Sequence, residues 1–492
     1  MAIKPKHVVD PIASLSTLLP ETSLLSRLPS LLPITFLVNG NTSDVWRESS
    51  TSIILWSRLI ILLSEPGAPR VFPNKMVNAV NNTVRACLER CSDYGFPAGG
   101  LEYSEECYCG DVEDIAANGG VMRPESECNM LCNGDPYHLC GGQQRLQLYQ
   151  WNGSLNIWHE PQNTGRYEFL TSSPVVPLIS TLGINDKVTF VEKWGTSIYP
   201  NSTGAYELDL TLVNDYTKTW REMHVKSDVF CAASLVLPDK AGRQITVGGW
   251  SVDSLYGIRL YAPDGSAGVN GTNDWEEDVY VLALQRGRWY PTALVLANGS
   301  VLVVGGEHGS NGVPEPTLEI LPKPEGGNTS VYLDWLQRTD PNNLYPFLYV
   351  LPTNGDIFVS EYSHTSRCSI GSKLHPTGYW NEARILDKVT FETIKVLPNL
   401  PGSVISGVAG RTYPLAGAST LFPQYYPYTG PLEVLFCGGS DILEFQKALD
   451  NCISVQPEVP EPTWTIERMV SIKATSTPRL LSNDSFPSLP AV

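Results

Sequence analysis

The feature that most constrains the fold is a repeat between residues 228 and 316. In each copy, a strand-like segment is followed by a turn and by a second, β-branched strand that ends in a glycine pair. The second strands are Gln244–Val247 and Val301–Val304, and the glycine pairs begin at Gly248 and Gly305. These two glycines lie 57 residues apart, near the long end of the period of kelch-type propeller blades. The repeat therefore predicts a β-propeller.

Cys231 and Tyr290 occupy equivalent places at the openings of the two copies, about where inner strands approach a propeller axis. Taken singly, each residue has an ordinary explanation. A lone buried cysteine usually behaves as a small hydrophobe, and the Trp-Tyr-Pro segment at Tyr290 is typical of a strand start in a core. The pairing of the two residues within one repeat favours a functional pair instead.

The openings resemble the glyoxal oxidase branch of the copper radical oxidases, which are relatives of galactose oxidase. The resemblance is carried by Phe230-Cys231-Ala232, by Arg288-Trp289-Tyr290-Pro291-Thr292 and by the segment 316–322, and it extends over roughly residues 165–475. It implies a thioether bond between Cys231 and Tyr290, with Tyr290 as both a copper ligand and the radical. It also implies oxidation of a small aldehyde or alcohol by O2, which yields H2O2.

The histidines needed for the rest of this copper site are missing from the sequence. The family pattern has a tyrosine followed directly by a histidine and then another histidine later in the chain, and imidazole is the expected ligand for copper. Only His138 follows a tyrosine directly (Tyr137), and it lies in the cysteine-rich segment outside the oxidase resemblance; no histidine lies beyond His375. His364 has the wrong spacing from Tyr362, and we do not assign His308 as a ligand. We therefore expect an incomplete copper site and no oxidase activity in this chain.

A second organising feature is a cluster of seven of the eleven cysteines within residues 71–150. Its members are Cys87, Cys91, Cys107, Cys109, Cys128, Cys132 and Cys140. Such density predicts a disulfide scaffold in an oxidising compartment. A zinc site is the alternative, but no histidine lies at zinc-ligand spacing and His138 is isolated. Because the number is odd, one cysteine is expected to have no partner within the segment.

The same segment resembles a WSC domain. The match is carried by Cys87-x3-Cys91, Cys107-Tyr-Cys109-Gly, Cys128-x3-Cys132 and the segment 139–149. The resemblance implies a carbohydrate-binding module with cell-wall polysaccharide as its partner. Its candidate sugar-stacking aromatics, for which core packing is the alternative role, are Tyr94, Phe96, Tyr103, Tyr108 and Tyr137.

The expected fold class is mainly β: a small disulfide-rich WSC module and an incomplete kelch-type seven-bladed β-propeller. About five blade-like units can be recognised, and the family match ends near Met469 in a Ser/Pro/Leu-rich tail. The expected divisions are an unassigned segment 1–70, the WSC-like domain 71–150, a linker 151–165, a partial propeller 166–475 with an insertion at 360–379, and an unstructured tail 476–492.

Several features indicate an extracellular or cell-wall location, although no signal peptide is recognisable. The net charge of −17 argues against nucleic acid as a partner, because nothing basic is available to neutralise phosphates. The apolar stretch 52–64 is too short to span a bilayer.

Cys437 and Cys452 are expected to form a disulfide that could contribute about 3 kcal/mol. Glycosylation sequons occur at Asn41, Asn81, Asn152, Asn201, Asn270, Asn298, Asn328 and Asn483.

Two functions follow from these observations. The first is a WSC-tethered, glyoxal oxidase-like copper radical oxidase that is inactive in this chain because copper ligands are absent. The second is a non-catalytic protein that binds cell-wall polysaccharide. A kelch-type scaffold for protein partners is a third and weaker reading.

Overall fold

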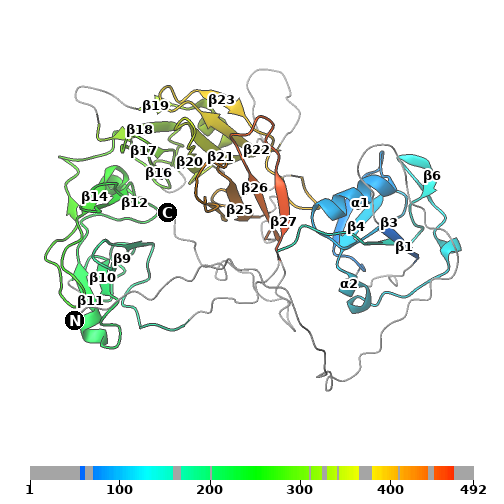
Figure 1. The fold of residues 1–492 in the computed structure, drawn as a ribbon, viewed down its shortest axis with the longest axis horizontal. Helices are drawn as coiled ribbons and strands as arrows, with labels where there is room; N and C mark the ends of the chain where they lie inside the picture. The colour runs from blue at the N-terminus through cyan, green and yellow to red at the C-terminus, as the bar shows by residue number, and fades with distance from the viewer. Residues whose placement is uncertain are drawn as a thin grey trace, which may run out of the picture. The chain divides into compact units, whose positions relative to one another are not determined.

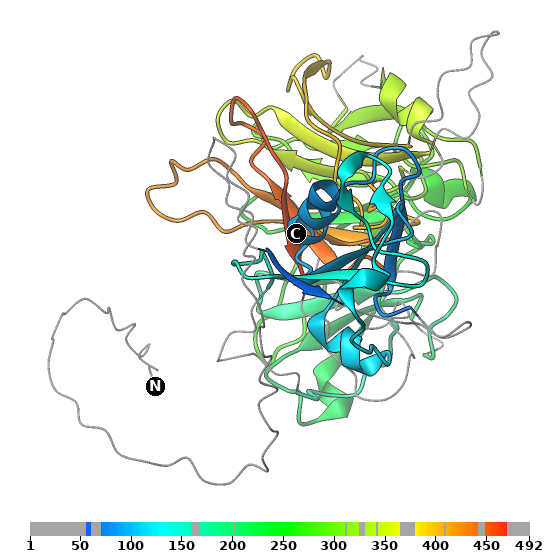
Figure 2. The same ribbon diagram turned by 90° about the vertical axis from the view of Figure 1, so that its right-hand side faces the viewer.

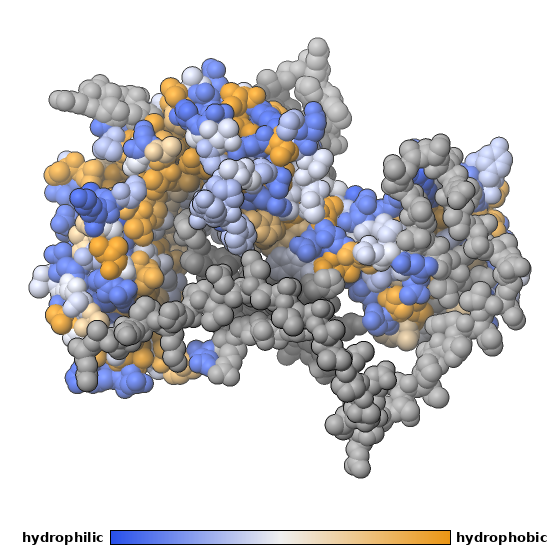
Figure 3. Space-filling view, viewed as in Figure 1, coloured by the Kyte–Doolittle hydropathy of each residue, from blue (hydrophilic) through white to orange (hydrophobic). Residues whose placement is uncertain are grey.

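The computed structural model describes residues 56–60, 70–158, 168–199, 202–309, 312–323, 330–340, 343–364, 379–407, 410–440 and 448–469. It is mainly β, as the sequence predicts, with a disulfide-rich N-terminal module followed by a series of four-stranded sheets (Figure 1). No helix in these ranges is long and apolar enough to cross a membrane. On the face shown in Figure 3, hydrophobic and hydrophilic residues are interspersed.

The N-terminal module is built on a five-stranded sheet with the order β1-β7-β3-β4-β2. Its strands are β1 (Trp56–Ile60), β2 (Asn74–Val77), β3 (Ala98–Glu102), β4 (Glu106–Gly110) and β7 (Gln147–Trp151). The remaining elements are α1 (Val84–Asp93), α2 (Val112–Ala117), η1 (Glu125–Glu127), β5 (Leu131–Cys132) and β6 (Asp135–Leu139). Strand β1 comes from the segment that the sequence left unassigned, and it pairs antiparallel with β7.

Three disulfides hold this module together, linking Cys87 to Cys107, Cys91 to Cys109 and Cys132 to Cys140. The first two fasten α1 to β4, and all six cysteines are buried in one core cluster. Thr83 caps the N-terminus of α1: its side chain accepts a hydrogen bond from the backbone N–H of Ala86 at 3.0 Å. This cap satisfies one of the first turn's unpaired donors. A helix of ten residues is marginal alone, so the disulfides and this cap stabilise it together.

Five four-stranded antiparallel sheets follow, and in each the strand order follows the chain, as in propeller blades. Blade 1 comprises β8 (Ile179–Leu182), β9 (Lys187–Val191), β10 (Ala205–Asp209) and β11 (Trp220–Met223), with α3 (Tyr216–Thr219). Blade 2 comprises β12 (Ala233–Val236), β13 (Gln244–Val247), β14 (Ile258–Tyr261) and β15 (Glu276–Glu277), with η2 (Val252–Tyr256). Blade 3 comprises β16 (Thr292–Val295), β17 (Val301–Val304), β18 (Thr317–Leu321) and β19 (Val331–Tyr332), followed by α4 (Asp334–Thr339). Blade 4 comprises β20 (Phe347–Val350), β21 (Ile357–His364), β22 (Tyr379–Leu386) and β23 (Thr393–Val396). Blade 5 comprises β24 (Gly417–Leu421), β25 (Val434–Gly438), β26 (Asn451–Val455) and β27 (Thr465–Arg468).

The core lies between successive blades. Leu302 of blade 3 and Ile357 of blade 4 belong to one buried cluster, and Phe358 of blade 4 and Phe436 of blade 5 belong to the next. Of two consecutive residues in β21, Ile357 therefore packs toward blade 3 and Phe358 toward blade 5, because successive side chains of a strand point to opposite faces. Burying each such side chain stabilises the fold by about 1.5–3 kcal/mol. This explains why strands packed between two blades, such as β17 and β21, carry apolar residues on both faces.

Buried arginines secure the glycine pairs that close the second strands. In three blades, a guanidinium donates to the carbonyl of the first glycine of the pair: Arg259 to Gly248 at 2.7 Å, Arg288 to Gly305 at 2.8 Å and Arg411 to Gly438 at 2.6 Å. All three glycines have positive φ, a backbone conformation that favours glycine. The glycine pairs recognised in the sequence are therefore turns held by a buried cation.

Blade 4 departs from this pattern in the segment that was expected to be an insertion. Strands β21 and β22 extend into it and pair residue by residue from Ile357–Leu386 to His364–Tyr379. Residues 365–378 lie outside the described part of the chain. Ser360 takes the place of Val304 in blade 3, and β21 continues through Glu361 where Gly305 begins the glycine pair; Ser360 and Glu361 are both buried.

Glu361 is an unusually placed acid. Both of its carboxyl oxygens are buried without a hydrogen-bond partner among the described residues, and the nearest cation is Arg384, with its Nη2 at 3.9 Å. Burial raises the pKa of Glu361 to about 8, only partly offset by the charge of Arg384. A carboxyl with a raised pKa is stabilised in its neutral form.

We predict that Glu361 makes the stability of the folded chain fall as pH rises. The folded state keeps its proton up to about pH 8, whereas the unfolded state loses it near the ordinary value of 4.5. Between these values, Glu361 should lower the unfolding free energy by up to about 1.4 kcal/mol per pH unit. Glu361→Gln should remove this slope and stabilise the protein at pH 8.

Denaturant unfolding of the wild type and of Glu361→Gln at pH 5, 6, 7 and 8 measures the effect. Glu276→Gln, at an exposed strand position, is the matched control and should follow the wild type. A difference between Glu361→Gln and the wild type that does not change with pH would show that Glu361 is ionised throughout.

Candidate functional site

Residues in left-handed backbone conformation stand just before the first strands of successive blades. Cys231, Tyr290, Tyr345 and Ala416 have φ values of 59°, 62°, 51° and 54°. The first three each lie two residues before their strand, and Ala416 directly precedes β24. Such a conformation costs a non-glycine residue on the order of 1–3 kcal/mol, and it persists only where surrounding contacts impose it. It recurs here in four consecutive blades.

Backbone hydrogen bonds join these residues from one blade to the next. The N–H of Tyr290 donates to the carbonyl of Cys231 at 3.0 Å, and the N–H of Tyr345 donates to the carbonyl of Tyr290 at 3.1 Å. The structure therefore brings together Cys231 and Tyr290, the two residues that the sequence singles out. It adds Tyr345 from the next blade as their neighbour.

Aromatic rings surround Tyr290, which is 7% exposed. Tyr413 stacks on it with ring centroids 4.7 Å apart and an interplanar angle of 22°. Their hydroxyls lie 3.3 Å apart. The ring centroid of Trp289 lies 4.2 Å from that of Tyr290, and Tyr345 meets the Tyr290 ring edge-on with the centroids 5.4 Å apart. We call Cys231, Trp289, Tyr290, Tyr345 and Tyr413 the phenol cluster.

Sequence reasoning missed Tyr345 and Tyr413, although a signal for both is present. Each is followed by proline, as Tyr290 is. The Tyr-Pro pair thus recurs at blade openings and could have pointed to all three. His308, which is not assigned as a copper ligand, bonds through its Nε2 to Glu315 at 2.8 Å.

The surroundings keep the phenol cluster uncharged. Burial raises the pKa of Tyr290, and its hydrogen bonds with Tyr413 and Cys231 raise it further. Burial likewise raises the pKa of Tyr345 well above its usual range. For the Cys231 thiol, burial raises the pKa more than the hydrogen bonds from Tyr290, Tyr345 and Trp289 lower it. Near neutral pH the cluster therefore holds phenols and a thiol in their protonated forms.

Buried arginines anchor the two stacked tyrosines. Arg288, two residues before Tyr290, is fully buried, and its Nε donates to Glu319 at 2.9 Å. Arg411, two residues before Tyr413, donates to Asn451 at 2.7 Å. Burial lowers the pKa of Arg411 to about 9. A buried arginine two residues before the tyrosine therefore fixes Tyr290 in blade 3 and Tyr413 before blade 5 in the same way.

The donors next to Tyr290 do not form a typical copper site. They are the phenols of Tyr345 and Tyr413 and the Cys231 thiol, whereas copper favours imidazole. Three histidines whose side chains the structure describes each bond to a carboxylate: His138 to Asp135, His224 to Asp274 and His308 to Glu315. None of these three joins the phenol cluster, and the described side chains around Tyr290 do not fit the mononuclear copper site that the resemblance implies.

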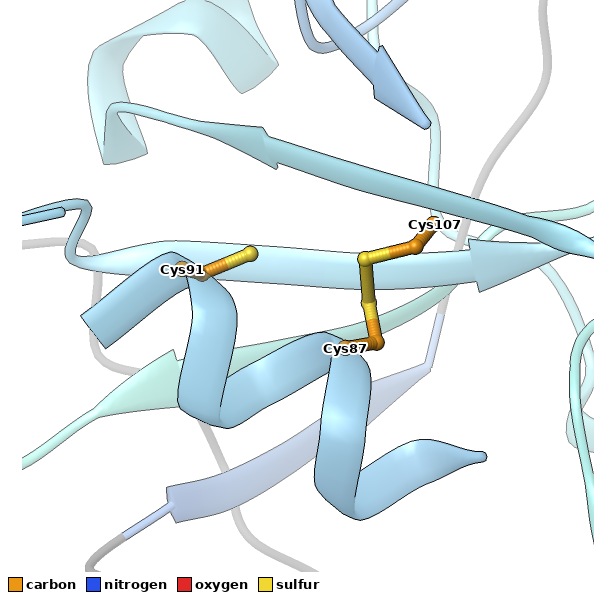
Figure 4. A group of neighbouring side chains, drawn as sticks. All are labelled: Cys87, Cys91 and Cys107. Atoms are coloured by element: carbon orange, nitrogen blue, oxygen red, sulfur yellow. A yellow bond between two sulfur atoms is a disulfide. The ribbon is translucent and has the colours of Figure 1, made fainter. Parts of the chain in front are cut away.

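A second group of potential metal ligands is explained by disulfides. The sulfurs of Cys87, Cys91 and Cys107 lie within 4.8 Å of one another. Figure 4 shows the bond between Cys87 and Cys107, with Cys91 one turn along α1. Because Cys91 is bonded to Cys109, these sulfurs are not thiolates that could hold zinc. This favours the disulfide interpretation of the cysteine cluster over the zinc alternative.

The remaining site residues lie as follows. Cys437 and Cys452 form a disulfide across β25 and β26, as the sequence predicts.

In the N-terminal module, Tyr94, Phe96 and Tyr108 are buried, which favours core packing, while Tyr103 is 47% and Tyr137 is 88% exposed. The sequons Asn81, Asn152, Asn270 and Asn298 are exposed, and Asn201 and Asn328 lie outside the described ranges. The phenol cluster and the exposed tyrosines are therefore the candidate functional groups.

Comparison with known families agrees with this architecture. Residues 64–142 match the WSC domain family, and residues 209–375 match the family described as glyoxal oxidase N-terminus. The chain thus carries a WSC domain followed by a glyoxal oxidase-type region. The WSC match begins before the predicted boundary at 71, and the oxidase match runs into the segment expected to be an insertion.

Relatives share one or both parts. A WSC domain-containing protein of Arthroderma benhamiae is 53% identical over 420 residues, which are 85% of this chain and 43% of that protein. The aldehyde oxidase GLOX of Vitis pseudoreticulata is 28% identical over 260 residues, covering 51% of this chain and 42% of its own. The chain therefore spans less than half the length of these relatives. A fungal alcohol oxidase of the AA5 family, solved in complex with copper, aligns at 17% identity with a TM-score of 0.41, covering 62% of this chain and 56% of the oxidase.

Proposed function

We propose that this chain is a WSC-tethered, glyoxal oxidase-like protein whose oxidase-type region does not turn over substrate. The observation that carries the proposal is the phenol cluster, in which Cys231 and Tyr290 lie together among phenols with no described imidazole beside them. In the oxidase reading, the family reaction would convert an aldehyde, water and O2 to a carboxylic acid and H2O2. The expected location is extracellular or at the cell wall.

The physical reason for the expected inactivity is the set of donors around Tyr290. Copper favours imidazole ligands. The described side chains next to Tyr290 are Trp289, Tyr345, Tyr413 and Cys231, and none of them supplies an imidazole. Without copper held beside Tyr290, the Cys231 thiol should remain unmodified.

We predict that the chain releases no H2O2 from methylglyoxal or glyoxylic acid, even after incubation with copper. Cys231 should remain a thiol that alkylating reagents modify once the chain is unfolded. An H2O2-release assay run beside mass spectrometry of the peptides containing Cys231 and Tyr290 measures both outcomes. Cys231→Ser, treated identically, is the control for peptide assignment. Copper-dependent turnover, or a loss of two hydrogens that links the two peptides, would contradict the prediction.

A second candidate function is binding of cell-wall polysaccharide by the WSC domain. The observation that favours it is the exposure of Tyr103 and Tyr137 on a module fixed by three disulfides. Tyrosine offers an apolar ring and a hydroxyl with little conformational freedom to lose. The rigid module therefore presents side chains suited to stacking on sugar rings.

We predict that the full chain adsorbs to at least one of insoluble chitin, β-glucan and xylan. Tyr137→Ala should weaken adsorption by about tenfold, which corresponds to about 1.4 kcal/mol. Val121→Ala, at another exposed position of the module, should leave it unchanged. Adsorption isotherms on the three polysaccharides measure the effect. Retention of the wild type on none of them would rule out this candidate.

A further inference from the structure

The connection between β24 and β25 differs from its counterparts in the other blades. It comprises residues 422–433, whereas the corresponding connections comprise 183–186, 237–243, 296–300 and 351–356. Those shorter connections contain no aromatic residue, but this one contains Phe422, Tyr425, Tyr426 and Tyr428. Figure 2 shows it as an orange loop that stands out from its blade. We call residues 422–433 the tyrosine loop.

Three tyrosines of this loop are turned to solvent. Tyr425, Tyr426 and Tyr428 are 80%, 87% and 66% exposed. Tyr426 and Tyr428 meet edge-on with ring centroids 6.3 Å apart. Single exposed hydrophobic residues are common on protein surfaces and need no functional explanation. Contiguous exposed apolar groups, such as these three tyrosines within four positions, usually mark an interaction site.

The loop is held in shape by its own bonds. The N–H of Phe422 donates to the carbonyl of Glu433 at 3.0 Å, and the N–H of Tyr428 donates to that of Tyr425 at 2.7 Å. The side chain of Gln424 donates to the carbonyl of Gly430 at 3.2 Å, and Leu432 is buried in the blade core. Three prolines further limit its conformations. A rigid surface loses little entropy when it binds a ligand.

The chemistry of the loop selects an uncharged ligand. Glu433, at its base, is the only charged residue between 422 and 433, so the exposed part offers rings, hydroxyls and an amide. The net charge of −17 for the whole chain disfavours acidic polymers. A neutral sugar ring has an apolar C–H face that can stack on tyrosine and hydroxyls that can bond to phenols and amides. This combination matches the loop.

We propose that the tyrosine loop is a second glycan-binding surface, which takes a neutral polysaccharide chain by stacking sugar rings on Tyr425, Tyr426 and Tyr428. It follows the end of β24, and the Ala416 turn precedes the start of that strand. The loop and the turn therefore lie at opposite ends of β24, so the loop is separate from the phenol cluster. The loop also belongs to a different part of the chain from the WSC domain, which matches residues 64–142. The proposal does not rest on the WSC domain binding sugar.

Chemical footprinting of the full chain tests the loop directly. Tyrosines are acetylated with N-acetylimidazole in the presence of hexasaccharides of β-glucan, chitin or xylan, and the modified peptides are quantified by mass spectrometry. One of these glycans, at about four times its Kd, should slow modification of the loop tyrosines about fivefold. Tyr280, which is 92% exposed in the connection between β15 and β16, should be unaffected. Equal slowing at Tyr280 would overturn the proposal, and so would no slowing at the loop with any of the three glycans.

A pair of variants separates ring stacking from other effects. Tyr425→Ser/Tyr426→Ser should weaken adsorption to the matching insoluble polysaccharide by about tenfold, whereas Tyr425→Phe/Tyr426→Phe, which keeps the rings, should stay within about threefold of the wild type. Protection confined to Tyr103 and Tyr137, with unchanged adsorption of the serine variant, would place binding in the WSC domain alone. That result would overturn this proposal while leaving the WSC function intact.

Discussion

The structure of the candidate site depends on a buried cation, the guanidinium of Arg288. It donates to the carbonyl of Gly305 at 2.8 Å, to that of Thr317 at 2.9 Å and to the carboxylate of Glu319 at 2.9 Å. An arginine buried this completely is tolerable only when its donors are satisfied and its charge is paired. Because Tyr290 follows two residues later, these bonds also fix where its ring can lie. The position of Tyr290 is thus a consequence of how the blade closes.

The blades then combine their strained openings into one cluster. Left-handed residues at Cys231, Tyr290 and Tyr345 are linked by backbone hydrogen bonds between neighbouring blades. Tyr413 completes the cluster from blade 5, where Arg411 repeats the role of Arg288. Similar local parts therefore bring together side chains that are up to 182 residues apart in the sequence (Cys231 to Tyr413). The result is a site of protonated phenols and a thiol.

Local patterns predict the elements of this fold better than its contacts. The glycine pairs at Gly248 and Gly305 predict blades because each forms a left-handed turn at the end of a second strand. The stacking of Tyr413 on Tyr290 could not be derived, since it depends on how separate blades are placed around the site. The same is true of β1, whose pairing with β7 is set by tertiary structure rather than by its own short apolar run. Glu361 replaces a glycine of the pattern, so its burial was also beyond local reasoning.

The central claim is that the fold places Cys231 beside Tyr290 while the described donors around them do not suit copper. Equilibrium dialysis against Cu²⁺, followed by metal analysis and electron paramagnetic resonance, tests this most directly. The account predicts less than stoichiometric copper after removal of loosely bound ions, and no change in the spectrum when Tyr290→Phe replaces the wild type. One copper per chain, with nitrogen hyperfine structure that depends on Tyr290, would contradict it.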